Sequence, residues 1–181
     1  SGIARDHGLK VHMDGARFAN AVAGLECDPA DISWKAGIDV LSFGATKNGC
    51  LAAEAILLFE TSLAREARYR AKQAGQMLSK QRFLSAQLLA YVEDDLWLGN
   101  ARHANRQAAA LASRLEALDG VELLPRDNTN LMYVRFPAAH VSALQAAGAA
   151  GHIYENGAMR LACSWASTDE DIDRFVDLLT D

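Results

Sequence analysis

The sequence has few cysteines and no cysteine motif. Cys27, Cys50 and Cys163 are an odd number, lie far apart and form no CxxC pair. This pattern argues against a disulfide framework and against a zinc cage built from cysteines. It is typical of proteins in a reducing cytosol, so we expect a cytoplasmic protein.

A basic composition and a long apolar segment are also missing. Lys and Arg together number 18 against 23 Asp plus Glu, the net charge is -5, and basic residues form no run. Nucleic acids and anionic membranes bind basic faces, so we expect neither as a partner. The most apolar stretch, residues 51–59, is interrupted by Glu54 and is too short to cross a bilayer. No signal-peptide pattern opens the chain.

What is present is the composition of a folded globular protein. Half of the 181 residues are hydrophobic and 23% are charged, which argues against disorder. At about 100–200 residues per domain, this length allows one domain, or one domain with a small appendage.

The N-terminal part alternates strand and helix patterns. Strands are predicted at residues 9–13, 38–43 and 52–59, and a short helix with an N-terminal proline at residues 28–34. The third strand is nearly continuous in apolar residues, as in strands buried on both faces of a parallel or mixed sheet. This part is therefore predicted to be α/β.

The rest of the chain is first helical and then mixed. Residues 62–118 predict about three helices, with breaks at Gly75 and Gly99 and an end at Gly120. A capping box from Thr168 to Asp171 predicts a final amphipathic helix. Between Gly120 and that helix we predict strands at residues 121–124, 130–136 and 159–164 and a helix at residues 139–147.

These patterns divide the chain into three parts. Residues 1–98 are expected to form the C-terminal part of a large α/β domain, and residues 99–119 a connecting helix. Residues 120–181 are expected to form a complete small α+β domain.

Two strand ends carry the chemical signal. Asp14 ends the first strand, in HMDGAR, and Lys47 follows the second, in SFGATKNG. Open α/β sheets bind ligands at the carboxyl ends of their strands, so we expect both side chains at one site. Lysine forms a Schiff base with pyridoxal phosphate, and an acid keeps the pyridine nitrogen protonated. Small neighbours let the backbone approach a flat cofactor. The two motifs therefore predict a pyridoxal phosphate site.

Together with the Ala-Glu-Ala strand that follows them, these motifs closely resemble the low-specificity L-threonine aldolases, pyridoxal phosphate enzymes of fold type I in the β-eliminating lyase group. The resemblance runs through the whole chain. It implies reversible cleavage of a β-hydroxy-α-amino acid, such as threonine, into glycine and an aldehyde. It also implies a homotetramer built from dimers with shared active sites.

The resemblance implies roles for single residues. Lys47 would be the Schiff-base lysine and Asp14 the partner of the pyridine nitrogen. Arg17 would lie near the ring oxygen and the substrate carboxylate. Arg160, within Met-Arg-Leu, would bind the substrate α-carboxylate, a task that suits the two-pronged guanidinium.

One segment departs from the family pattern. Many relatives have a Gly-rich stretch whose arginine reaches the phosphate of a neighbouring subunit, whereas this chain has Ser-Lys-Gln-Arg at residues 79–82. Either Lys80 or Arg82 is expected at the phosphate.

Other chemistries are less well supported. His12 and Asp14 form an H-x-D array, but a metal needs three or four converging ligands and no further cluster is offered, so we expect no metal site. A Ser–His–Asp order and the Walker and Rossmann glycine patterns are missing too. Another fold type I lyase, such as a phenylserine-selective aldolase or an aromatic amino-acid lyase, stays open.

The start of the chain leaves a third alternative open. It lacks an initiator Met, and residues 1–8 predict the end of a helix with its Gly stop. In the family, a ring-stacking histidine, the main phosphate loop and a further histidine precede the Asp motif. This alternative is a truncated, catalytically incompetent chain that by itself binds pyridoxal phosphate poorly and aggregates or exchanges partners.

Overall fold

The computed structural model describes residues 1–149 and 151–180, which divide into two compact units. The first unit comprises Ser1–Val22 and Glu26–Leu98, and the second comprises Ala23–Leu25 and the described residues from Gly99 onward. Each unit is described by itself. Within the described ranges, no helix combines the length and the apolar character that a membrane crossing requires.

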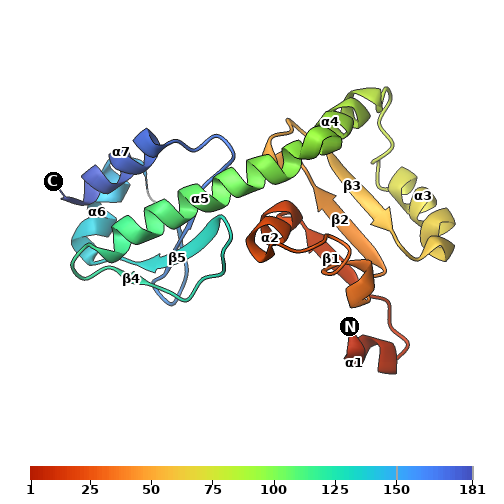
Figure 1. The fold of residues 1–181 in the computed structure, drawn as a ribbon, viewed down its shortest axis with the longest axis horizontal. Coiled ribbons are helices and arrows are strands. Elements are labelled where there is room, and N and C mark those ends of the chain that lie inside the picture. The colour runs from red at the N-terminus through yellow and green to blue at the C-terminus, as the bar shows by residue number, and fades with distance from the viewer. Residues whose placement is uncertain (150, 181) are drawn as a thin grey trace. The chain divides into compact units, whose positions relative to one another are not determined.

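The first unit contains a three-stranded sheet and four α-helices (Figure 1). The strands are β1 (His12–Gly15), β2 (Val40–Gly44) and β3 (Glu54–Leu58). The helices are α1 (Gly2–Asp6), α2 (Phe18–Leu25), α3 (Ala64–Gln73) and α4 (Arg82–Val92). Short 3-10 helices occur at Trp34–Ala36, Thr46–Asn48, Thr61–Leu63 and Glu93–Asp95.

The sheet is mixed, with β2 in the middle. β1 pairs with β2 in parallel, and β3 pairs with β2 antiparallel. The register sets Asp14 beside Ser42 and Ser42 beside Ile56, so these three side chains share one face. Leu41 and Phe43 alternate onto the opposite face, which carries the core.

An aromatic cluster fills that core. The ring centroid of Phe43 lies 6.1 Å from that of Phe18, 5.8 Å from that of Tyr91 and 5.7 Å from that of Trp97. Edge-to-face and tilted contacts at these separations are favourable ring geometries. The cluster joins α2 and α4 to the central strand, and so fixes the chain on both sides of the predicted site.

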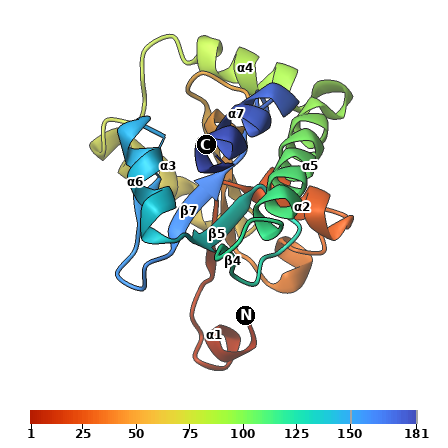
Figure 2. The same cartoon turned by 90° about the vertical axis from the view of Figure 1, so that its left-hand side faces the viewer.

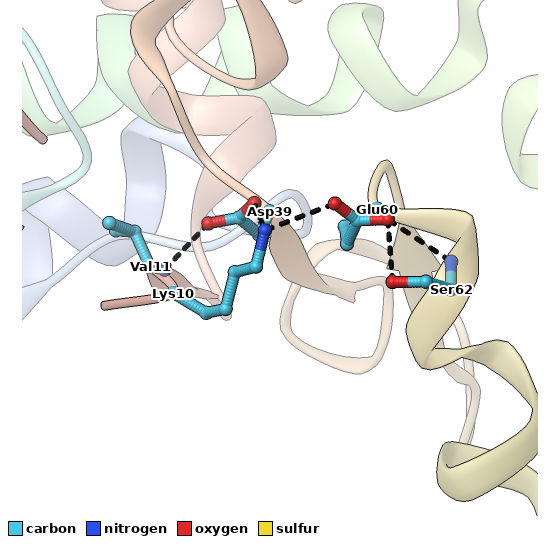
Figure 3. A network of polar contacts seen from close by, with 5 residues as sticks. All are labelled: Lys10, Val11, Asp39, Glu60 and Ser62. Atoms are coloured by element: carbon cyan, nitrogen blue, oxygen red, sulfur yellow. Dashed lines mark hydrogen bonds and ion pairs between the residues drawn. The ribbon is translucent and has the colours of Figure 1, made fainter. Parts of the chain in front are cut away.

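A polar network ties the other ends of the strands together (Figure 3). The Lys10 ammonium donates to Asp39 over 3.2 Å and to Glu60 over 3.0 Å. The second Asp39 oxygen accepts the Val11 N–H over 2.8 Å, and Glu60 accepts both the N–H and the hydroxyl of Ser62. These side chains join the start of β1, the start of β2 and the end of β3.

The second unit packs three helices on one antiparallel sheet. Its strands follow the order β4 (Glu122–Leu123), β5 (Leu131–Arg135), β7 (Met159–Ala162) and β6 (His152–Ile153). Its helices are α5 (Leu96–Glu116), which begins in the first unit, α6 (Ala138–Ala146) and α7 (Asp169–Thr180). Figure 2 looks onto this unit, with α5, α6 and α7 beside β5 and β7. Side chains of all these helices meet Met132, Val134 and Met159 in one core.

The predicted capping box of the last helix is confirmed. The Thr168 hydroxyl accepts the Asp171 N–H over 3.2 Å, and the Asp171 carboxylate accepts the Thr168 N–H over 3.0 Å. These bonds satisfy two N–H groups at the start of α7. Hydrogen bonds from the Thr168 N–H and hydroxyl to the Asp171 carboxylate lower the pKa of Asp171 below its ordinary value.

The prediction of a helix at residues 28–34 is wrong. The segment forms successive turns and then a 3-10 helix at Trp34–Ala36. The Asp28 carboxylate accepts the Ala30 N–H, and the Ser33 hydroxyl donates to the Pro29 carbonyl over 2.7 Å. Such local bonds compete with a regular helix. The sequence patterns also missed two elements, the helix α2 and the short strand β6.

The predicted helix break at Gly99 is wrong as well. Gly99 lies inside α5, and the break falls at Glu93–Asp95, where Asp94 and Asp95 adopt φ values of 51° and 56°. Asp tolerates the left-handed region better than most residues, and two successive residues in that region interrupt the helix. The predicted break at Gly75, with φ 71°, is confirmed between α3 and α4.

The prediction that the third strand is buried on both faces is wrong. Ile56 in β3 is 62% exposed and Leu57 is 39% exposed. β1 and β3 are the edge strands of this sheet within the described residues, so their apolar side chains have fewer neighbours than those of β2.

The Lys10 network predicts a pH-dependent contribution to stability. Hydrogen bonds from Ser62 and Lys10 lower the pKa of Glu60 from its ordinary 4.5 to about 2. A carboxylate whose pKa is depressed on folding stabilises the fold above its unfolded pKa, and this contribution is lost as the pH falls toward the folded pKa. We expect Glu60→Gln to lower the free energy of unfolding at pH 7, and the deficit to shrink between pH 4.5 and pH 2.

Urea unfolding of the wild-type chain and the variant across this range measures the effect. Asp31→Asn is the matched control, because the Asp31 carboxylate forms an exposed ion pair with Lys35 one turn away. A Glu60→Gln deficit that is the same at pH 7 and pH 3 would contradict this interpretation.

Candidate active site

The sheet topology brings the predicted acid and lysine to the same edge. Asp14 is the third residue of β1, and Lys47 lies in the 3-10 helix that follows β2. Because β1 and β2 are parallel neighbours, their carboxyl ends lie together (Figure 1). The two residues come from motifs far apart in the sequence, and the parallel pairing places them at one end of the sheet.

Asp14 is exposed, and one of its two carboxylate oxygens is used by its own turn. Its Oδ1 accepts the Ala16 N–H over 3.0 Å, and among the described residues Oδ2 has no hydrogen-bond partner. Gly15 makes this turn possible, because a Cβ there would come within 2.5 Å of Leu41 and of the Ser42 carbonyl oxygen. The Asp-Gly pair thus presents a carboxylate oxygen at the strand end.

Lys47 is also exposed, and its ammonium makes no hydrogen bond or ion pair within the described ranges. The chain on both sides of it is anchored. Asn48, only 3% exposed, donates to the Tyr91 hydroxyl over 2.6 Å and to the Trp97 carbonyl over 2.8 Å. The Thr46 hydroxyl accepts the Ala53 N–H over 3.0 Å. The loop therefore holds the lysine backbone in place and leaves the amine free to react.

Gly44 packs closely against neighbouring atoms beside the lysine loop. A Cβ on Gly44 would meet the Ala16 Cα at 2.7 Å and a Glu54 carboxylate oxygen at 3.0 Å. The other Glu54 oxygen accepts the Thr46 N–H over 3.3 Å. Gly44 thus leaves no side chain where the two strand ends approach each other.

Arg17 follows the Asp turn as the N-cap residue of α2. Its Nε is buried and has no hydrogen-bond partner in the part of the chain that the structure describes. A buried N–H without an acceptor costs about 1–3 kcal/mol. Arg17 thus leaves one buried donor beside the Asp turn unsatisfied by the described residues.

Two reactive groups near the loop are held neutral. Burial raises the pKa of Tyr91 to about 12, although its hydrogen bond with Asn48 acts in the opposite direction. Burial, with the nearby Glu54 charge, also raises the pKa of Cys50. Neither group is therefore ionised at neutral pH.

The structure places the two phosphate candidates apart from this hydrogen-bonded framework. Lys80, with φ 59°, precedes α4, and Arg82 begins that helix with its guanidinium 5.3 Å from the Phe83 ring centroid. Both side chains are exposed, and no hydrogen bond or ion pair joins either to Asp14 or Lys47 in the described residues. The choice between them stays open.

Arg160 lies in the second unit, on the sheet face opposite the helices. Its register partners are Tyr133 on β5 and His152 on β6. Arg135, on the same sheet, pairs with both Glu122 oxygens at 3.0 and 2.9 Å. Arg160 is exposed and has no ion pair within the described ranges, so its guanidinium is available to an anion.

An apolar cavity of about 610 Å³ opens on the core face of the first sheet, away from Asp14. Its lining includes Phe18, Leu57, Leu88 and Trp97, and no ionisable side chain contributes to it. A cavity lined by no ionisable side chain offers no acid or base, so we do not place the chemistry there.

Sequence reasoning missed one contact at the site. The H-x-D array suggests only a metal ligand at His12, whereas the His12 Nε2 shares a hydrogen bond of 2.8 Å with the Ser42 hydroxyl. The H-x-D spacing shows that His12 and Asp14 share a face of β1, but Ser42 becomes their neighbour only through the β1–β2 register.

Three comparisons with known proteins agree with this geometry. The Beta-eliminating lyase family model matches residues 1–138. The chain is 45% identical to a low specificity L-threonine aldolase of Pseudomonas aeruginosa, over 100% of this chain and 52% of that protein. It is 46% identical to the enzyme of the same description from Pseudomonas sp., over 91% of this chain and 48% of that protein.

A solved structure shows the same fold. Threonine aldolase of Leishmania major superposes with a TM-score of 0.84 at 28% identity, covering 99% of this chain and 53% of that chain. The fold class predicted from the sequence, fold type I α/β with a small α+β part, is thereby confirmed. The chain spans about half the length of the curated relatives it matches.

The anchoring of the lysine loop predicts a stability effect separate from chemistry. Asn48→Ala removes two donated hydrogen bonds and leaves the buried Tyr91 hydroxyl without this donor, so we expect a loss of about 1–3 kcal/mol in the free energy of unfolding. Lys47→Ala, at an exposed residue, should stay within about 0.5 kcal/mol of wild type. Chemical denaturation measures both, and equal midpoints for the two variants would contradict the proposed anchoring.

Proposed function

The chain belongs to the beta-eliminating lyase family, and from this premise we propose that it acts as a carbon–carbon lyase dependent on pyridoxal phosphate. The proposed reaction cleaves L-threonine and related β-hydroxy-α-amino acids into glycine and an aldehyde. The curated relatives are described as L-threonine aldolases, and the chain matches about half of their length. The activity of a whole enzyme is therefore part of the proposal.

One observation carries this proposal. Parallel pairing of β1 and β2 puts Asp14 and Lys47 at the same end of an α/β sheet, where among the described residues one Asp14 oxygen and the Lys47 amine have no partner. An acid and a reactive amine at a strand end are the two groups that a pyridoxal cofactor needs from a protein. The family match and the named relatives agree with that chemistry.

The residues present fit pyridoxal phosphate. The buried Arg17 Nε lacks an acceptor, as expected where a ring oxygen or a carboxylate would supply one. Gly44 lets the Ala16 backbone and the Glu54 carboxylate pack closely at the two strand ends, where a side chain would not fit. When bound, the cofactor supplies an electron sink for the electron pair released from the broken Cα–Cβ bond.

The roles of the large-domain residues follow from their chemistry. Lys47 would hold the cofactor through its amine, which the anchored loop leaves unpaired. Asp14 would hold a proton on the pyridine nitrogen with its free oxygen. Arg17 would donate to the ring oxygen and to the substrate carboxylate, and either Lys80 or Arg82 would bind the phosphate.

Arg160 would orient the substrate from the small domain. Its guanidinium is exposed and unpaired within the described residues, in contrast to that of Arg135 on the same sheet. A guanidinium binds a carboxylate with two parallel N–H groups and so fixes its orientation as well as its position.

The cellular setting belongs to the same proposal. We propose that the protein is cytoplasmic and forms a homo-oligomer, either a dimer or a tetramer. We also propose that residues 1–98 are part of a large domain, residues 99–119 a connecting helix and residues 120–181 a small domain. The free thiols of Cys27, Cys50 and Cys163 support a reducing compartment. The resemblance to the aldolases supports the oligomer.

Release of glycine tests the proposed reaction. The chain, supplied with pyridoxal phosphate, is incubated with L-threonine and separately with L-phenylserine, and glycine is quantified by amino-acid analysis. We expect glycine from threonine with an equal amount of acetaldehyde, and a loss of at least a thousandfold in Lys47→Ala because the covalent attachment is gone.

Arg135→Gln is the control, because Arg135 pairs with Glu122 and should leave glycine release unchanged. Glycine from phenylserine alone would favour the aryl-selective aldolase, and no glycine from either substrate would rule out the proposed activity for this chain.

A further inference from the structure

The Ser42 hydroxyl has two polar neighbours on β1, His12 and Asp14. His12 and Asp14 alternate onto the same face of β1, and Ser42 is the register partner of Asp14 on β2. Although Asp14 is its direct neighbour, the hydroxyl shares its 2.8 Å hydrogen bond with His12 Nε2. No hydrogen bond joins Ser42 to Asp14 in the described part of the chain.

The consequence concerns the second oxygen of Asp14. Oδ1 is occupied by the Ala16 N–H over 3.0 Å, so Oδ2 is the oxygen left for a ligand. A serine hydroxyl has a single proton to donate. If that proton goes to His12, it is not available to compete for Oδ2.

We propose that His12 is a positioning residue that accepts the Ser42 hydroxyl proton at Nε2 and thereby keeps Asp14 Oδ2 free for the pyridine nitrogen of the cofactor. The inference rests on the proposed function for the identity of that ligand. It concerns only residues of β1 and β2, and its first test needs no cofactor.

The relative strength of two hydrogen bonds explains why the Ser42 hydroxyl needs His12 as its partner. A hydrogen bond from a hydroxyl to a carboxylate is charge-assisted and stronger than one to a neutral imidazole. Without His12, the hydroxyl would turn to Asp14, its register partner, and the carboxylate would be stabilised within the protein. His12 must then carry its own proton on Nδ1, which leaves Nε2 as the acceptor.

The first test reads Asp14 directly in the cofactor-free chain. Carbon-13 NMR of the labelled carboxyl group gives its pKa in each variant. Hydrogen bonding to the charged form lowers a carboxyl pKa, so we expect His12→Ala to lower that of Asp14 by about one unit. The double variant His12→Ala/Ser42→Ala should return it to the wild-type value. The charged groups of neighbouring elements (Lys10, Arg17, Lys47, Glu54, Glu66 and Arg70) are the same in all these variants.

The second test measures binding of pyridoxal phosphate by tryptophan fluorescence. One pKa unit corresponds to a tenfold change in an equilibrium constant, so His12→Ala should bind the cofactor about tenfold more weakly. Ser42→Ala and the double variant should bind like wild type, and His12→Gln should recover most of the affinity because its amide oxygen can accept the hydroxyl. His7→Ala, in an exposed turn, is the matched control.

The outcomes separate the two proposals. Weaker binding in Ser42→Ala, or an Asp14 pKa that His12→Ala leaves unchanged, would overturn the role of His12. If no variant binds pyridoxal phosphate, the proposed function fails, and the carboxyl titration still decides whether His12 holds the hydroxyl. Thermal unfolding of each variant shows whether the fold is retained, and the isosteric Ser42→Ala change gives a readout even where His12→Ala is destabilised.

Discussion

The parallel pairing of β1 with β2 is the contact on which the site depends. It aligns Asp14 with Ser42 and brings the lysine loop after β2 to the strand end that carries the acid. A shift of this register by one residue would turn Asp14 to the core face, because side chains alternate along a strand. The aromatic cluster around Phe43 on one face, and the Lys10 network at the opposite strand ends, both oppose such a shift.

Neighbouring residues of the site differ in how firmly their side chains are held. Asn48 is buried and fully engaged, whereas Lys47 beside it is exposed and unpaired within the described residues. Arg17 has a buried Nε that no acceptor in the described part of the chain satisfies. Unmet polar groups cost stability, and proteins retain them mainly where a ligand completes the arrangement. This division is what a covalently held cofactor requires of its protein.

The chemistry was more predictable from the sequence than the geometry. HMDGAR and SFGATKNG revealed the cofactor chemistry because few residue types can perform it, and the capping box at Thr168 was readable because its bonds are local. The break at Asp94 was not, because a glycine at position 99 is a stronger breaker signal than a run of acids. The partnership of His12 with Ser42 depends on strand register, which no single-sequence pattern supplies.

The central claim is that this strand edge makes one lysine reactive toward pyridoxal phosphate. The most direct measurement is to mix the chain with the cofactor, fix the attachment with sodium borohydride and map the modified lysine by peptide mass spectrometry. The account predicts one modified site, Lys47, at low cofactor concentration. Comparable modification of other exposed lysines, such as Lys35 and Lys72, with no preference for Lys47 would contradict it.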